Sequence, residues 1–301
     1  MKIFLKILLV VSMISLPQQS FPAERMKLRH LTSLYFDERG VGFKQPESVA
    51  CNEKSLLVVA DTGNNRLLRF NFQEGIWRAG PEIRVPQLSH PIQVQINSAG
   101  EMLALDGKKR RIIRLSPDGQ FKGYLDPEGL PSPAAPVPRS FRVDKKDSLY
   151  ILDIFSGRVL VLGPEGKFQK SIEFPQKYGF LSDLAVDPRG NILVIDCVKA
   201  RVFSAAKDSP SFSPLSGELK EYSNFPTSVT TDQRGTIYIV DKNGGQILVL
   251  GPDGSFLGRQ LSMGWNEGLL YYPSQMCINE RGEAFIADRS NSRIQIFTMV
   301  K

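Results

Sequence analysis

Short apolar runs that end in an aspartate recur along the chain, each followed by a polar turn and a second apolar run. In residues 58–70 the first run ends at Asp61, and the second starts after Arg66. This pattern predicts two antiparallel strands joined by a tight turn. It occurs six times, at spacings of 43 to 47 residues, with the acids at Asp61, Asp106, Asp153, Asp196, Asp241 and Asp288. A period of this length built from strands and turns is typical of a β-propeller with one blade per repeat.

Another strand is predicted before each of these pairs. Fifteen residues before the acid the repeats carry Pro46, Pro91, Pro138, Leu181, Pro226 and Pro273. Proline suits the first residue of a strand, where no ladder donor is needed. Apolar residues then alternate with polar ones. After this strand, six residues before the aspartate, four repeats have a glycine: Gly100, Gly190, Gly235 and Gly282. We expect these glycines to adopt a positive φ in a hairpin turn.

A fourth strand follows a Pro-Asp/Glu-Gly turn at 117–119, 164–166 and 252–254. The fourth repeat lacks this turn, so the sequence leaves its outer strand undefined. The predicted repeats cover about 43–87, 88–134, 135–178, 179–222, 223–269 and 270–301. The sixth stops where its fourth strand would begin, and segment 28–36 alternates like a strand. We therefore expect 28–36 to supply the outer strand of the last blade and close the ring.

The stretch from Pro46 to Arg66, with Asp61-Thr62-Gly63-Asn64-Asn65 at its end, resembles the NHL repeat. The resemblance extends over about residues 28–301. It implies an all-β fold, a six-bladed propeller of four-stranded antiparallel blades that forms one domain from residue 24 to 301.

The first 23 residues carry the pattern of a secretory signal peptide. Lys2 and Lys6 precede a short apolar run at 7–16, and a polar, proline-containing end follows. The run is shorter than the roughly 20 residues that a membrane-spanning helix needs. We expect a secreted or periplasmic protein without stable membrane insertion; a short membrane anchor is the alternative.

The histidine and cysteine counts each limit the chemistry of a site. The 301 residues carry a formal charge of +7. Only His30 and His90 are histidines, so this chain alone cannot build a three-histidine zinc site. Cys51, Cys197 and Cys277 are expected to be free, buried thiols, although one pair is arithmetically possible.

Residues that differ between repeats are the best candidates for a ligand site, because an Asp–Arg pair present in almost every blade reads as scaffold. The innermost strands contribute Gln93, Asp183 and Gln275 at one repeat position, with Arg142 two residues further on in its own blade. We expect these side chains at the channel, either at a ligand or lining a water-filled pore. A basic block, Lys108-Lys109-Arg110, occupies the turn of blade two, and Arg139 begins blade three. We expect this basic surface to bind an anion or an acidic partner, or to be a solvated loop.

The predicted function is a monomeric binding or scaffold module that recognises a protein, peptide or polysaccharide on one face. Nucleic acid is not expected, because the signal peptide directs the chain away from RNA and the basic turns lack stacking aromatic residues. The resemblance also implies an alternative, since related six-bladed propellers include lactonases, calcium hydrolases and zinc-dependent amidating lyases. Channel calcium is then possible, with Glu47 and Asp183 as the carboxylates, but no cofactor is expected.

Overall fold

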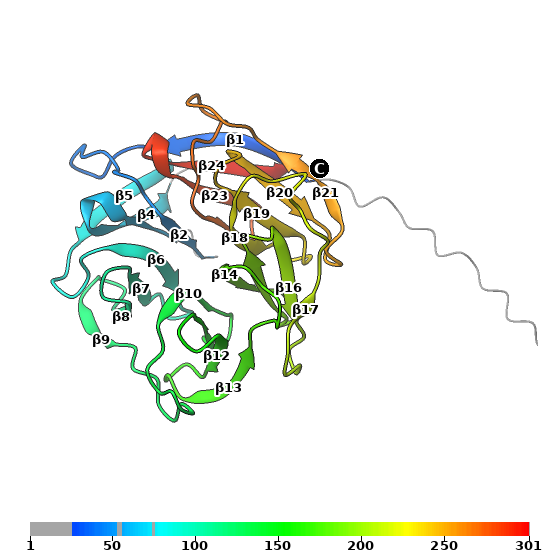
Figure 1. Cartoon of the computed structure of the whole chain (residues 1–301). Helices are drawn as coiled ribbons and strands as arrows, with labels where there is room; N and C mark the ends of the chain where they lie inside the picture. The colour runs from blue at the N-terminus through cyan, green and yellow to red at the C-terminus, as the bar shows by residue number, and fades with distance from the viewer. Residues whose placement is uncertain (1–25, 53–55, 74–75, 301) are drawn as a thin grey trace, which may run out of the picture.

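The computed structural model describes residues 26–52, 56–73 and 76–300. The predicted signal peptide lies outside these residues. Within them the strands form six four-stranded antiparallel sheets, arranged as blades around a central axis (Figure 1). The all-β, six-bladed propeller is therefore confirmed.

Each of blades 1 to 3 uses four consecutive strands. Their bounds are β2 Ser48–Cys51, β3 Leu56–Asp61, β4 Arg66–Gln73, β5 Ile76–Ile83, β6 Pro91–Ile96, β7 Met102–Asp106, β8 Arg111–Leu115, β9 Phe121–Tyr124, β10 Pro138–Val143, β11 Leu149–Asp153, β12 Arg158–Leu162 and β13 Phe168–Glu173. In blade 3 the glycine position of the first turn is held by Asp147, at φ 61°, whereas Gly100, Gly190, Gly235 and Gly282 show the expected positive φ.

Blades 4 and 5 follow the same order, and blade 6 combines both ends of the described chain. The bounds are β14 Leu181–Val186, β15 Ile192–Asp196, β16 Arg201–Ala205, β17 Ser213–Pro214, β18 Pro226–Thr231, β19 Ile237–Asp241, β20 Gln246–Leu250, β21 Phe256–Gln260, β22 Met276–Ile278, β23 Glu283–Asp288, β24 Arg293–Val300 and β1 Lys27–Leu34. The outer strand of blade 4 has only two residues, in line with the missing turn signal.

Ring closure by the N-terminal segment is confirmed. Strand β1 pairs antiparallel with β24, from Lys27 opposite Val300 to Leu34 opposite Ile294. Figure 1 shows this pair as a blue arrow beside a red one. The edge of β24 is thus covered by residues that precede the first repeat.

A disulfide joins blades 1 and 6 at their inner strands. Cys51 on β2 and Cys277 on β22 are bonded, with their Cα atoms 6.2 Å apart and 226 residues between them in the sequence. The expectation of three free thiols is therefore wrong for these two, because ring closure brings the first and last blades together. Cys197 is free and buried, and burial raises the pKa of its thiol.

The core lies between facing blades rather than along the central axis. Buried side chains group into six clusters; the one between blades 1 and 2 contains Val58, Leu67, Met102 and Ile113. Every residue of the second strands β7, β11, β15 and β19 is buried. Their continuous apolar sequence reflects packing on both sheet faces.

The aspartate that ends each second strand has no exposed surface. Each carboxylate accepts a hydrogen bond from a backbone N–H of the loop that enters its blade. The donors are Lys44, Ser89, Val137, Gly179, Asn224 and Tyr271, at 2.6 to 3.0 Å. Burial by itself would raise the pKa of Asp106, but hydrogen bonds from the N–H groups of Lys109 and Ser89 hold it below its usual value.

The arginines that stand five residues after these aspartates differ in their partners from blade to blade. Arg66, Arg158 and Arg293 donate to the aspartate of their own turn, at 2.7, 3.4 and 2.8 Å. Arg111 pairs with Asp126 instead, and Arg201 with Glu218. The expectation of one Asp–Arg pair wherever the sequence repeats is wrong for blades 2 and 4.

A buried ion cluster fixes the closing segment to blade 1. Arg66 Nη1 lies 2.6 Å from Asp37 Oδ2, which belongs to the segment after β1, and 3.0 Å from Glu82 Oε2 on β5. The hydrogen bond from Arg66 lowers the pKa of Glu82 to about 2, from an ordinary 4.5. The cluster therefore requires ionised carboxylates.

The disulfide predicts a measurable loss of stability on removal. Replacing Cys51 and Cys277 by serine should lower the free energy of unfolding by about 2–4 kcal/mol. Without the bond the unfolded chain is no longer closed into a loop, so its conformational entropy is higher. Urea unfolding with and without reductant measures this. Reductant should destabilise the wild type and leave the double variant unchanged; equal curves for wild type and variant would contradict the prediction.

The ion cluster predicts a pH dependence. Because the folded-state pKa of Glu82 is depressed, its contribution is complete above about pH 4.5 and is lost as the pH falls towards 2. The wild type should lose unfolding free energy across this window, and Glu82→Gln should lose less. Urea unfolding at stepped pH tests this, with the exposed Glu165→Gln as the matched control. Identical slopes for all three proteins would refute it.

Candidate functional site

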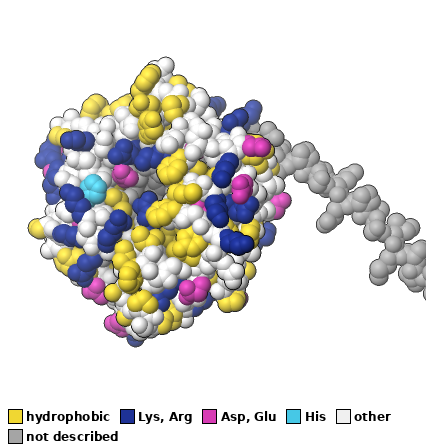
Figure 2. All heavy atoms as spheres, viewed as in Figure 1, with side chains coloured by type: hydrophobic (Ala, Val, Ile, Leu, Met, Phe, Trp, Pro, Cys, Tyr) yellow, Lys and Arg dark blue, Asp and Glu magenta, His cyan; other side chains and the backbone are white. Residues whose placement is uncertain are grey.

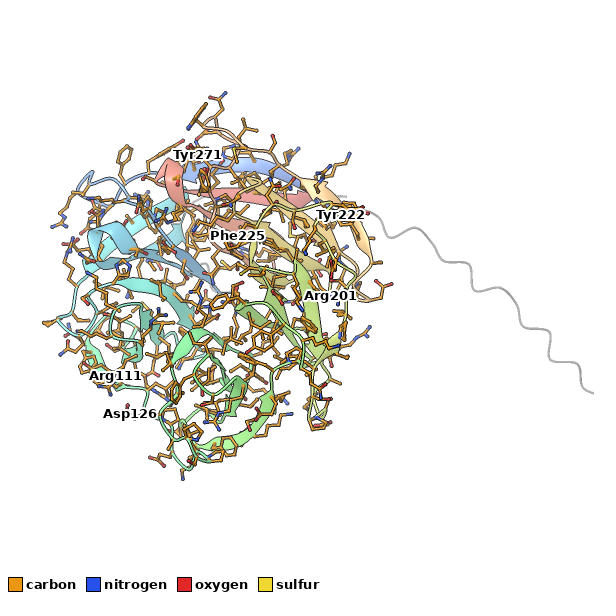
Figure 3. The ribbon with its side chains drawn as sticks, viewed as in Figure 1. Arg111, Asp126, Arg201, Tyr222, Phe225 and Tyr271 are labelled. Carbon is orange, nitrogen blue, oxygen red and sulfur yellow. A yellow bond between two sulfur atoms is a disulfide. The ribbon has the colours of Figure 1, made fainter. Side chains whose placement is uncertain are left out.

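One face of the ring, the upper face, consists of the second-to-third strand turns and the loops that connect successive blades. Antiparallel strands place these two kinds of segment at the same end of each blade. Backbone hydrogen bonds join them, as from Gly107 to His90 and from Lys242 to Phe225. Figure 3 labels Asp126, Tyr222, Phe225 and Tyr271 in these segments, with Arg111 and Arg201 at the first positions of the third strands β8 and β16.

The upper face carries most of the exposed hydrophobic side chains. In the described part of the chain eleven large hydrophobic residues are exposed, and only Leu31 and Ile76 lie on outer strands instead. The other nine are Phe36, Val41, Phe155, Tyr178, Phe180, Val198, Met263, Trp265 and Tyr272. Figure 2 shows hydrophobic side chains and Lys and Arg side chains interspersed around the centre of the face it displays.

The predicted basic block lies on this face. Lys108, Lys109 and Arg110 are all exposed in the turn between β7 and β8. Lys109 Nζ donates to the carbonyl oxygens of Pro86 and Gln87, both at 3.0 Å. Across residues 26–52, 56–73 and 76–300, Lys108 and Arg110 form no ion pair, so their charges are available to a partner.

Arg139 lies apart from the basic block, in blade 3. It lies half-buried on β10, with its guanidinium carbon 5.8 Å from the centroid of the Phe180 ring. The arrangement is a cation–π contact between the first strand of blade 3 and the loop that leads to blade 4.

The predicted channel residues form hydrogen bonds between blades. Gln93 Nε2 donates to Ser140 Oγ and to the carbonyl oxygen of Phe141, at 3.1 and 3.0 Å. Gln275 Oε1 accepts from the N–H of Val49 at 3.1 Å, across the junction of the last and first blades. Both glutamines are buried, which suits a role in holding neighbouring inner strands together.

Asp183 has the most contacts of this group. It accepts hydrogen bonds from Ser140 Oγ of blade 3 and, at 2.6 Å, from Ser228 Oγ of blade 5. Arg142 Nη2 lies 2.8 Å from Asp183 Oδ2 and 3.2 Å from the Val229 carbonyl oxygen. Arg142 Nη1 is buried, and the described residues offer it no hydrogen-bond partner. That Arg142, Asp183, Gln93 and Gln275 bind a ligand stays a prediction.

The donor set around the inner strands does not fit a divalent cation. Calcium prefers several carboxylate and carbonyl oxygens. Glu47 pairs with Arg289 at 2.8 Å, and Asp183 is already engaged with Arg142. Nowhere in the described residues do three or more His, Cys, Asp or Glu side chains gather in a way that could hold a metal.

Sequence reasoning missed the exposed hydrophobic residues of blades 3 and 4. Two residues after the aspartate stand Phe155 and Val198, where the other four repeats have Gly63, Lys108, Asn243 and Ser290. This departure from a small or polar residue was the available signal. Whether such side chains are covered depends on the neighbouring loop, which the repeat does not specify.

Comparisons with known proteins support the fold. The model of the NHL repeat family matches residues 270–297, which confirms the resemblance to NHL repeats. A search of curated proteins finds no match to this sequence. The described part of the chain contains no helix of the length and apolarity needed to cross a membrane.

Solved structures share the architecture at low sequence identity. A gluconolactonase from Xanthomonas campestris is 14% identical with a TM-score of 0.68, over 93% of this chain and 97% of that one. A virginiamycin B lyase from Staphylococcus aureus, solved with quinupristin, is 14% identical with a TM-score of 0.64, over 92% and 100%. A chain of a nidogen/laminin complex is 15% identical with a TM-score of 0.59, over 78% and 91%. At identities this low, the structural similarity shows a shared fold alone.

The contacts of Asp183 predict a role in stability. Asp183→Asn should cost about 3–5 kcal/mol, because it leaves the Arg142 charge buried without its counter-ion. Adding Arg142→Met to this variant should recover part of the loss. Thermal and urea unfolding of the single and double variants measure the coupling; additive effects would contradict the inter-blade role.

Proposed function

We propose that this propeller is a binding module that recognises a protein, a peptide or a polysaccharide on its upper face. The observation that carries the proposal is the concentration there of nine of the eleven exposed large hydrophobic residues in the described chain. These residues lie in the loop before blade 1, at blades 3 and 4, and in the loop before blade 6, and a gathering of exposed hydrophobic side chains on one face is typical of an interaction surface.

The scaffold suits this role. Recognition residues are commonly carried on loops held by a rigid framework. Here the loops are bonded to six buried aspartates, and the side chains that vary between blades project from them. The unpaired charges of Lys108 and Arg110 add an electrostatic contribution for an acidic partner.

We further propose that the module acts outside the cytoplasm, as a secreted or periplasmic protein and as a monomer. The signal-peptide pattern of residues 1–23 supports this location. The Cys51–Cys277 disulfide agrees with it, because such bonds persist in oxidising compartments. An RNA partner does not fit that location.

A hydrolase or lyase is the second candidate. It rests on the shared fold with the gluconolactonase and the virginiamycin B lyase. The inner-strand side chains favour the binding module over this alternative, since Asp183, Gln93 and Gln275 are engaged between blades. Stoichiometric calcium or zinc in the protein purified from its native source would reverse this preference.

Charge reversal on the upper face tests the binding module. Lys108→Glu combined with Arg110→Glu should lower affinity for a partner isolated from the native medium or periplasm about tenfold or more. The matched control is Lys146→Glu with Arg189→Glu, two exposed residues in first-to-second strand turns of blades 3 and 4, at the opposite face. Trp265→Ser probes the hydrophobic part of the upper face beside blade 6.

Calorimetric titration with that partner gives the affinities. Loss in the upper-face variants with retention in the control is the expected result. Equal affinity of all upper-face variants and the control would show that this face is not the binding surface.

A further inference from the structure

We propose that the part of the upper face formed by blades 2 to 4 binds an acidic polypeptide segment that also carries apolar side chains. The inference rests on the proposed function and names the chemistry of its partner. It starts from four exposed residues, the apolar patch: Phe155, Tyr178, Phe180 and Val198, whose exposed fractions are 67%, 41%, 39% and 58%.

The segments that carry the apolar patch are joined in sequence around the ring. The N–H of Ile154 donates to the carbonyl oxygen of Val137, and that of Phe174 to the carbonyl oxygen of Gly157 at 2.7 Å. The N–H of Cys197 in turn donates to Phe180 at 3.0 Å. The segments that carry the patch are therefore linked to one another over blades 3 and 4, and the basic block belongs to the neighbouring blade 2.

The apolar patch is pre-organised. Asp153 accepts a hydrogen bond from the N–H of Phe155 at 3.2 Å, and Asp196 accepts one from Val198 at 3.0 Å. Asp196 also accepts from the N–H of Phe180 at 3.1 Å. A surface whose backbone is already fixed loses little conformational entropy on binding, which favours recognition of a flexible segment.

The charges around the apolar patch are mainly positive. Arg139 contacts Phe180, Lys177 is exposed, and Lys199 is half-buried; in the described residues none of the three forms an ion pair. Asp153 and Asp196 are fully buried beneath the turns. The exposed carboxylates include Glu173 at the end of β13, and Asp126 and Glu218, which are paired with Arg111 and Arg201. Electrostatic complementarity therefore selects an acidic partner.

A polypeptide fits this surface better than a lipid bilayer does. The Arg139 guanidinium lies against an aromatic ring of the patch, and a cation among apolar side chains is costly to place in hydrocarbon. Against a peptide the same group can pair with a carboxylate. Aromatic residues and arginine are also the side chains that most often dominate the energy of protein interfaces.

Fluorescence anisotropy with a labelled synthetic peptide tests this chemistry. The probe is a short peptide that alternates glutamate with phenylalanine and leucine; a second peptide has glutamine in place of each glutamate. The full-length mature protein should bind the glutamate peptide about tenfold more tightly than the glutamine peptide. Vesicles of phosphatidylglycerol with phosphatidylcholine, and polygalacturonate, serve as competing probes.

Three protein variants complete the test. Phe155→Ser with Val198→Ser should weaken binding of the glutamate peptide about tenfold or more. Ile76→Ser, at an exposed hydrophobic residue on β5 of blade 1, should change it less than about twofold. Arg139→Gln should reduce binding of the glutamate peptide and leave the glutamine peptide unaffected. Thermal melts check that each variant is folded, and Arg139→Gln decides the outcome if the serine variant is not.

Three results would overturn the proposal: no peptide binding, equal affinity for the two peptides, or patch-dependent binding of vesicles or polygalacturonate in preference to peptide. The proposed function can survive such a failure. If Lys108→Glu with Arg110→Glu abolishes binding of the native partner and the patch variants retain it, the upper face binds and the acidic-peptide assignment falls. If none of these variants affects the native partner, both fail.

Discussion

The hydrogen bonds accepted by the aspartate at the end of each second strand determine the arrangement of the upper face. All six carboxylates are fully buried, and each receives an N–H from the loop that enters its blade. A buried carboxylate without such donors would be costly, so loop and turn must take up these positions together. These aspartates thus hold the loops and turns of the upper face in the same arrangement in every blade.

Variation in this shared arrangement produces the differences between blades. Where the arginine pairs with its own aspartate, as in blades 1, 3 and 6, the cation is buried; in blade 2 Arg111 moves outward to Asp126. The inner strands differ in the same way, since Asp183 alone among the ring positions brings a negative charge and draws Arg142 to it. The exposed Arg111–Asp126 pair and the inner Arg142–Asp183 pair thus each arise where one blade departs from the repeat.

The repeat carries enough information to predict the propeller, the number of blades and the closing strand, because strand periodicity and turn residues are local signals. The Cys51–Cys277 bond could not be predicted in this way, since it depends on two inner strands meeting across the whole ring. The same holds for Arg201, whose partner Glu218 lies in a loop without repeat character. The exposure of Phe155 likewise depends on how far an irregular loop extends beside it.

Blade 6 takes one strand, β1, from a segment that precedes every repeat and three from the last repeat. A ribosome therefore releases the partner of β1 only after all the other blades have been synthesised. Until then β1 has no partner strand in its own chain, because it pairs with β24. A strand without its partner presents backbone groups to which another chain can pair.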